Sequence, residues 1–173
     1  MRSWTYLLGA VVIAVAASVA KADMIGWQVP IASDQEVAPP TIPGDEPTGV
    51  GIVWLDTDAN ALSWTVHYAG LSDDLTLAHF HGPAPAGANA GVQVTIAASP
   101  EPKFGTLIGD AILSDDQESD LLDGLWYINL HTALNPGGEI RGQITAEDII
   151  PEPMTLSILG LGAAALLRRR RSF

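Results

Sequence analysis

The fold of this chain is decided by residues 124–145, which read GLWYINLHTALNPGGEIRGQIT. The first half is apolar and aromatic, which predicts a buried strand. Residues 135–138 (NPGG) form a turn signal. After the turn, Ile140 and Ile144 face one way and the polar residues between them face the other, which is typical of a second strand. The stretch therefore predicts two strands joined by a tight turn.

Similar segments occur upstream. Residues 62–68 alternate apolar and polar side chains, and residues 50–56 precede them across the polar turn at 57–60. This arrangement predicts a β-hairpin. Residues 76–81 and 92–96 read as two further strands.

One short helix is expected between the strands. Ser114 and Gln117 have the spacing of a capping box, and Gly124 is placed to end the helix. Many short strands with Gly/Pro turns and one helix predict an all-β sandwich or barrel. The expected core consists of Trp54, Leu62, Trp64, Val66, Phe80, Val92, Val94, Ile96, Trp126, Ile128, Leu130, Ile140 and Ile144.

The first 22 residues have the pattern of a signal peptide. Arg2 supplies a positive charge, residues 6–19 are apolar, and Ala20 and Ala22 are the small residues that signal peptidase reads, so we place cleavage after Ala22. A transmembrane helix is the weaker interpretation, because spanning a bilayer takes about 20 apolar residues. This pattern predicts export.

The last 23 residues, 151–173, form a second processing segment. An apolar run at 154–167 separates a short motif from a basic cluster. The residues of the motif and the cluster are Pro151, Glu152, Pro153, Arg168, Arg169, Arg170 and Arg171. The apolar run is short for a permanent membrane helix, and the arginines should remain cytoplasmic. The middle domain would then lie outside the cell.

Residues 23–150 are strongly acidic. Lys103 and Arg141 are the only basic residues in this segment, against nineteen acidic ones, which gives a formal charge of −17. A nucleic-acid partner is excluded on this ground, since binding phosphates takes Lys and Arg. The chain has no cysteine, which excludes disulfides, zinc–thiolate sites and thiol nucleophiles.

Several motifs of this segment resemble the CHRD domain, a module first named from chordin and also found in exported bacterial proteins. They are AHFHGP at 78–83, GVQV at 91–94, the stretch 124–143 and DQEV at 34–37. The resemblance covers about Trp27 to Ala146. It implies an immunoglobulin-like Greek-key sandwich or barrel with a distant likeness to Cu/Zn superoxide dismutase, and it implies no settled biochemical activity.

The tail resembles a PEP-CTERM sorting signal in its order of motif, apolar helix and arginine cluster. The resemblance implies an exosortase substrate of a Gram-negative bacterium that is membrane-anchored before processing near Pro151, Glu152 and Pro153. The destination would be the cell envelope, cell surface or extracellular matrix. A plain C-terminal anchor is the alternative.

Four histidines lie in strand-like segments. His79 and His81 are two residues apart, so both side chains point to one face of a strand, and His131 belongs to the other family motif. Three neutral imidazoles would suit copper or zinc, with His67 as a fourth ligand. The alternative is that these histidines are structural. Leu75 and Leu77 share the face of the His pair, which predicts that this face is partly core.

Two other polar groups have structural explanations. Asp56, Asp58 and Asn60 have the spacing that opens a calcium loop, but the later positions of an EF-hand are not satisfied. A hairpin turn with acidic tips, able at most to bind calcium weakly, explains them better. Glu139 and Arg141 could form cross-strand pairs, or Arg141 could bind an anion. A role in closing the domain is favoured.

These observations favour a non-catalytic surface or matrix protein that binds a polysaccharide or protein, or contributes to adhesion or packing. Its processing partners would be signal peptidase and exosortase, with at least transient membrane contact. We expect no catalytic residues and no obligatory cofactor. The alternative is a copper- or zinc-binding protein, with or without redox activity, that uses His79, His81 and His131.

Overall fold

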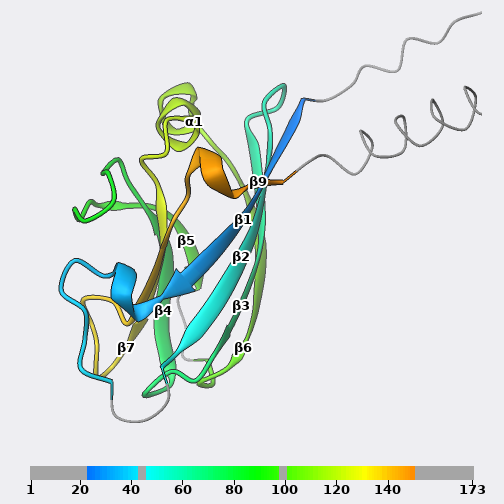
Figure 1. Cartoon of the computed structure of the whole chain (residues 1–173). Coiled ribbons are helices and arrows are strands. Elements are labelled where there is room, and N and C mark those ends of the chain that lie inside the picture. The colour runs from blue at the N-terminus through cyan, green and yellow to red at the C-terminus, as the bar shows by residue number, and fades with distance from the viewer. Residues whose placement is uncertain (1–22, 43–45, 98–100, 151–173) are drawn as a thin grey trace, which may run out of the picture.

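The computed structural model describes residues 23–42, 46–97 and 101–150 (Figure 1). The expected signal peptide at 1–22 and the expected sorting tail at 151–173, each with its apolar helix, lie outside these residues. Within the part that is described, no helix combines the length and the hydropathy that crossing a membrane requires.

The described residues form an antiparallel β structure with one α-helix. The strands are β1 (Met24–Ala32), β2 (Thr48–Asp56), β3 (Ala61–Ala69), β4 (Leu75–His81), β5 (Val92–Ala97), β6 (Gly105–Ile112), β7 (Tyr127–Thr132), β8 (Ile140–Gln143) and β9 (Ile149–Ile150). The helix is α1 (Asp115–Leu122), and two short 3-10 helices are η1 (Ser33–Gln35) and η2 (Ala146–Asp148).

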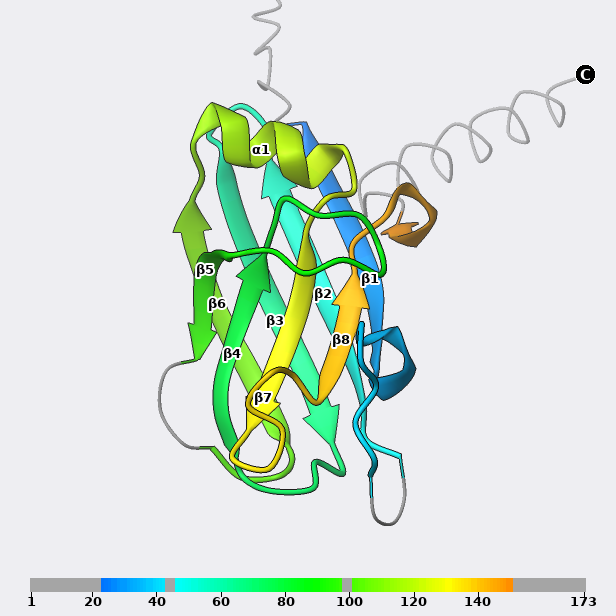
Figure 2. The ribbon, with the colours of Figure 1, turned by 90° about the vertical axis from the view of Figure 1, so that its left-hand side faces the viewer.

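The strands follow the order β5-β4-β7-β8-β1-β2-β3-β6, and β9 pairs with β1. The sheet folds over so that β5, β4, β7 and β8 face β1, β2, β3 and β6 (Figures 1 and 2). The result is a nearly closed barrel or sandwich, which confirms the predicted all-β class. The predicted hairpin is also confirmed, because β2 and β3 pair along their whole length, from Thr48 with Ala69 to Asp56 with Ala61.

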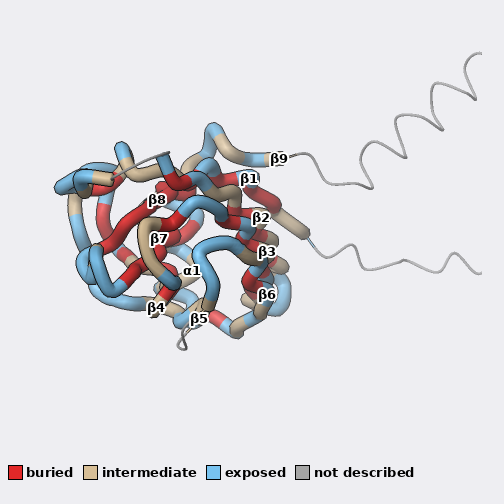
Figure 3. The backbone as a smooth tube through the Cα atoms, turned by 90° about the horizontal axis from the view of Figure 1, so that it is seen from below, coloured by how far each residue is buried: buried red, intermediate tan, exposed pale blue. Residues whose placement is uncertain are grey.

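The core lies between the two layers. Val53, Leu62 and Val66 from one layer and Phe80 and Ile128 from the other are completely buried. Seen along the sandwich, buried segments line the interior and exposed ones surround it (Figure 3). Buried and more exposed positions alternate along β3 and along the later part of β4, so every second side chain there faces outward.

The prediction of the core is wrong for two residues, and the cross-strand neighbours of these residues explain why. Val92 is 51 % exposed because it lies opposite His81, which faces outward. Trp54 is only half-buried because it points to the outer face of β2, where its ring lies over Gly26 of β1. Val94 and Ile96 are partly buried and pack against the core, and the other predicted core residues are buried.

The predicted helix is confirmed together with its cap. The Ser114 hydroxyl accepts a hydrogen bond from the Gln117 amide, and the Gln117 side chain accepts one from the Ser114 amide. Gly124 follows the helix with a φ of +76°, a left-handed conformation that favours glycine. The helix closes one end of the sandwich and leads directly into β7 (Figure 2).

Candidate metal-binding site

The three histidines that the sequence singles out come together on the outer face of neighbouring strands. Ala78 and Phe80 of β4 point into the core, so the alternate residues His79 and His81 point outward. β7 pairs with β4 and places His131 beside them. One ring nitrogen from each histidine lies within 4.8 Å of the other two.

This spacing is close to what one metal ion requires. Three atoms that are no more than 4.8 Å apart all lie within about 2.8 Å of a common point, and zinc–imidazole bonds are about 2.0–2.1 Å long. A small inward movement of the rings would therefore complete three bonds to a single ion.

Hydrogen bonds set the tautomers of two of these rings. The Nδ1 atom of His81 is 3.0 Å from the Ala90 carbonyl oxygen, and the Nδ1 atom of His131 is 3.1 Å from that of Pro136. Because a carbonyl oxygen only accepts, both rings carry a proton on Nδ1 and, when neutral, present a lone pair on Nε2. Both Nε2 atoms are buried and have no hydrogen-bond partner, and the same is true of Nδ1 of His79.

The surroundings keep all three rings neutral at pH 7. Burial, reinforced by the other two histidines, lowers the pKa of His131 to about 4 despite the opposing bond to Pro136. Burial also lowers the pKa of His79, with a further contribution from His81. Burial lowers the pKa of His81 despite the opposing hydrogen bond to the Ala90 carbonyl, and the Arg141 charge lowers it further. Neutral imidazoles are the form that binds a metal.

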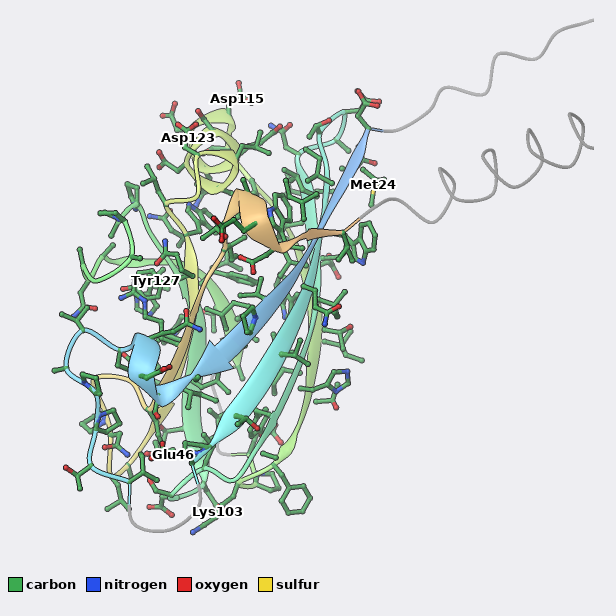
Figure 4. The ribbon with its side chains drawn as sticks, viewed as in Figure 1. Met24, Glu46, Lys103, Asp115, Asp123 and Tyr127 are labelled. Atoms are coloured by element: carbon green, nitrogen blue, oxygen red, sulfur yellow. The ribbon has the colours of Figure 1, made fainter. Side chains whose placement is uncertain are left out.

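The outer face is covered by the loop between β4 and β5, which crosses β7 and β8 (Figure 2). Tyr127 stacks on His81 at a centroid distance of 5.2 Å, and the Arg141 guanidinium lies 3.5 Å from the centroid of the same phenol ring. Arg141 also donates to the carbonyl oxygen of Ala88 and the side-chain oxygen of Asn89 in the loop. Tyr127 points to this side of the sandwich (Figure 4). These contacts hold the Ala90 carbonyl against His81.

The structure corrects the expectation that the histidine face is partly core. Leu75 is buried and Leu77 is 40 % exposed, because the register of β4 against β7 shifts between these two residues. Leu77, His79 and His81 therefore share an outward face. A β-bulge of this kind changes the direction of the side chains on either side of it.

His67 does not join the cluster. It lies on β3, in the opposite layer, and its Nδ1 atom is 2.8 Å from the hydroxyl of Thr106 on β6. The expectation of a fourth histidine ligand is therefore wrong.

The other polar groups have the structural roles that the sequence favours. Asp56 accepts hydrogen bonds from the backbone amides of Asp58 and Ala59 and so closes the β2–β3 turn. Glu139 accepts bonds from Ser72 and other residues around it. Arg141 donates to the loop and to Gln143 rather than to a carboxylate.

Sequence reasoning missed Glu36 and Asn129 as part of this region. The Oε1 atom of Glu36 and the Oδ1 atom of Asn129 are buried without a hydrogen-bond partner. Both side chains reach within 3.0 Å of the place that a Cβ on Gly138 would occupy, so only glycine fits there. Asn129 is two residues before His131 on the same face, a signal that was available. Glu36 belongs to the DQEV motif at 34–37, but it comes from a loop far away in the sequence, and nothing in the motif indicates that its side chain lies beside Asn129.

Burial raises the pKa of Glu36 to about 7, and the Arg141 charge opposes this shift only in part. The protonated form is therefore favoured in the folded state, so the contribution of Glu36 to stability is complete below about pH 4.5 and is lost as the pH rises through 7. At about 1.4 kcal/mol per pKa unit, the loss is about 3 kcal/mol.

We expect the Glu36→Gln variant, which resembles the protonated acid, to show this loss directly. In the metal-free protein, its unfolding free energy should equal that of the wild type near pH 4.5 and exceed it by about 3 kcal/mol near pH 8. Urea unfolding followed by tryptophan fluorescence measures both profiles. The titration of His131 affects both proteins equally and cancels in the difference. Parallel profiles across this range would contradict the assignment.

A comparison with protein families agrees with this architecture. The CHRD domain matches residues 27–144, which include every strand that carries the site. Comparisons with curated proteins and with solved structures give no significant match. Since the matched region covers well over half of the chain, this protein belongs to the CHRD domain family.

Proposed function

We propose that the CHRD domain of this protein binds one copper or zinc ion through Nδ1 of His79 and Nε2 of His81 and His131. Two observations carry the proposal: one ring nitrogen from each histidine lies within 4.8 Å of the other two, and each ring has a buried nitrogen without a hydrogen-bond partner. Leaving a buried polar atom without a partner costs free energy, and a metal ion would satisfy all three at once. The carbonyls of Ala90 and Pro136 act as the outer partners that orient metal-binding histidines.

The proposed setting is the bacterial envelope. The N-terminal pattern ending at Ala22 supports export, and the pattern from Pro151 to Arg171 supports PEP-CTERM sorting by an exosortase. An exported copper or zinc site built from histidines alone avoids thiol ligands, which oxidise outside the cell.

The second candidate is a surface or matrix module without a metal, acting in adhesion or packing. The acidic residues favour it, because a formal charge of −17 on residues 23–150 keeps such a domain hydrated and repels like-charged neighbours. This role does not require the three histidines to meet.

Calorimetric titration of the segment 23–150 with Cu(II) and Zn(II), without a His tag, separates the two. We expect one equivalent to bind with a dissociation constant below about 1 μM, and the His79→Ala/His81→Ala variant to bind at least a hundredfold more weakly. His67→Ala is the matched control and should bind like the wild type. Weak binding that is equal in all three proteins would remove the metal proposal and leave the adhesion or packing module.

A further inference from the structure

The side-chain atoms that lack hydrogen-bond partners are not spread evenly through the described part of the protein. Seven buried atoms are of this kind, and two of them are indole nitrogens in the core. The other five belong to the three histidines, Asn129 and Glu36. Buried polar groups in native proteins are nearly always satisfied, so five such atoms in one region point to a place where a ligand binds.

A metal ion accounts for the three nitrogens and leaves the two oxygens. Asn129 lies directly opposite His79 in the pairing of β4 with β7 and shares an outward face with His131. The Oε1 atom of Glu36 and the side chain of Asn129 meet over Gly138. Asn129 is 2 % exposed and Glu36 is 7 % exposed, so bulk water does not satisfy either oxygen.

A pocket of about 330 Å³ lies beside this region, with Glu36, Asn89, Pro136 and Gly138 among its lining residues. Two residues of its wall also contact the site. The Pro136 carbonyl oxygen is hydrogen-bonded to Nδ1 of His131, and the Asn89 side-chain oxygen accepts a hydrogen bond from Arg141. One water molecule takes about 30 Å³ of liquid volume. The pocket therefore offers room for a small molecule next to Glu36 and Gly138, beside the histidine site.

We propose that the bound metal keeps one position for an exchangeable water molecule, held by Asn129 and Glu36 and replaceable by a small anion that enters through this pocket. The inference rests on the proposed metal site and adds a ligand to it. A water molecule donates two hydrogen bonds, which matches two neighbouring acceptor oxygens. Three protein ligands with an open fourth position distinguish a reactive metal site from a purely structural one.

Azide is a suitable probe, because it binds Cu(II) and produces a charge-transfer absorption band. The full chain, purified in a mild non-ionic detergent and loaded with one equivalent of Cu(II), is titrated with azide, and the band and the electron paramagnetic resonance spectrum are followed. We expect a saturable band from one azide per copper. Intact copper binding without an azide band would overturn the open position and leave the proposed function standing. Failure to bind copper would instead refute the proposed function, and this inference with it.

Two variants test the roles of Asn129 and Glu36. Azide only accepts hydrogen bonds. Asn129→Leu removes an acceptor of the competing water, and Glu36→Gln replaces a carboxyl oxygen with an amide nitrogen that can donate to azide, so both changes should strengthen azide binding. We expect Asn129→Leu and Glu36→Gln each to bind azide at least tenfold more tightly while still binding one equivalent of Cu(II). Glu46→Gln, a change on an exposed loop residue, is the matched control and should leave azide binding unchanged. Azide affinity that is unchanged or weaker in both variants would overturn the roles of Asn129 and Glu36.

Discussion

The Glu139→Ala variant is expected to lose about 3–5 kcal/mol of unfolding free energy, because it removes a buried carboxylate that satisfies several donors at once. Glu139 is completely buried, and its oxygens lie 2.6 Å from the amide and from the hydroxyl of Ser72. They also accept hydrogen bonds from the Thr132 hydroxyl at 2.6 Å and from the side-chain amide of Asn135 at 2.8 Å. Burial alone would raise the pKa of Glu139, but these bonds together hold it below its usual value.

Urea unfolding of the segment 23–150 measures this loss. Glu147→Ala, which changes an exposed acid of the same segment, should remain within about 0.5 kcal/mol of the wild type. The variant should also weaken copper binding about tenfold or more, since the turn that Glu139 secures carries the Pro136 carbonyl that orients His131. A stability loss below about 1 kcal/mol would show that the network contributes little.

Trp126→Ala is expected to cost a similar amount, about 3–5 kcal/mol, through the cavity it leaves. The ring is completely buried, and its centroid lies 6.1 Å from that of Phe80, which in turn packs edge-on against Trp64 at 5.2 Å. The space beside the indole is so limited that a Cβ on Gly82 would collide with it. Such a tightly packed site cannot collapse easily after truncation.

Thermal and urea unfolding of Trp126→Ala measure this cost, with Leu134→Ala as the control. Leu134 is 63 % exposed, so its truncation should change stability by less than about 0.5 kcal/mol. Equal stability of Trp126→Ala and the wild type would mean that the aromatic chain from Trp64 to Trp126 is not part of the central core.

The fold could be predicted where alternation and turn residues agree. Residues 62–68 and their polar turn were sufficient for the β2–β3 hairpin, and Ser114 with Gln117 was sufficient for α1. The strands β1 and β6 were missed. Pro30 weakens the strand signal of β1 because proline has no backbone N–H to donate, and two glycines reduce the strand signal of β6. The pairing with their neighbours overrides these local preferences.

The site could be predicted only in part, for a similar reason. Spacing alone placed His79 and His81 on one face, and it could not show that β7 pairs with β4 and brings His131 beside them. The bulge that turns Leu77 outward also depends on that pairing. Glu36 and Gly138 meet across about a hundred residues of sequence, a contact that only the closed fold creates.

The most direct test of the metal site is an anomalous difference map, measured at the zinc absorption edge, from crystals of the segment 23–150 grown with Zn(II). We predict one strong peak about 2.0–2.1 Å from Nδ1 of His79 and from Nε2 of His81 and His131. A map with peaks only at surface carboxylates, and none between these three rings, would contradict the account.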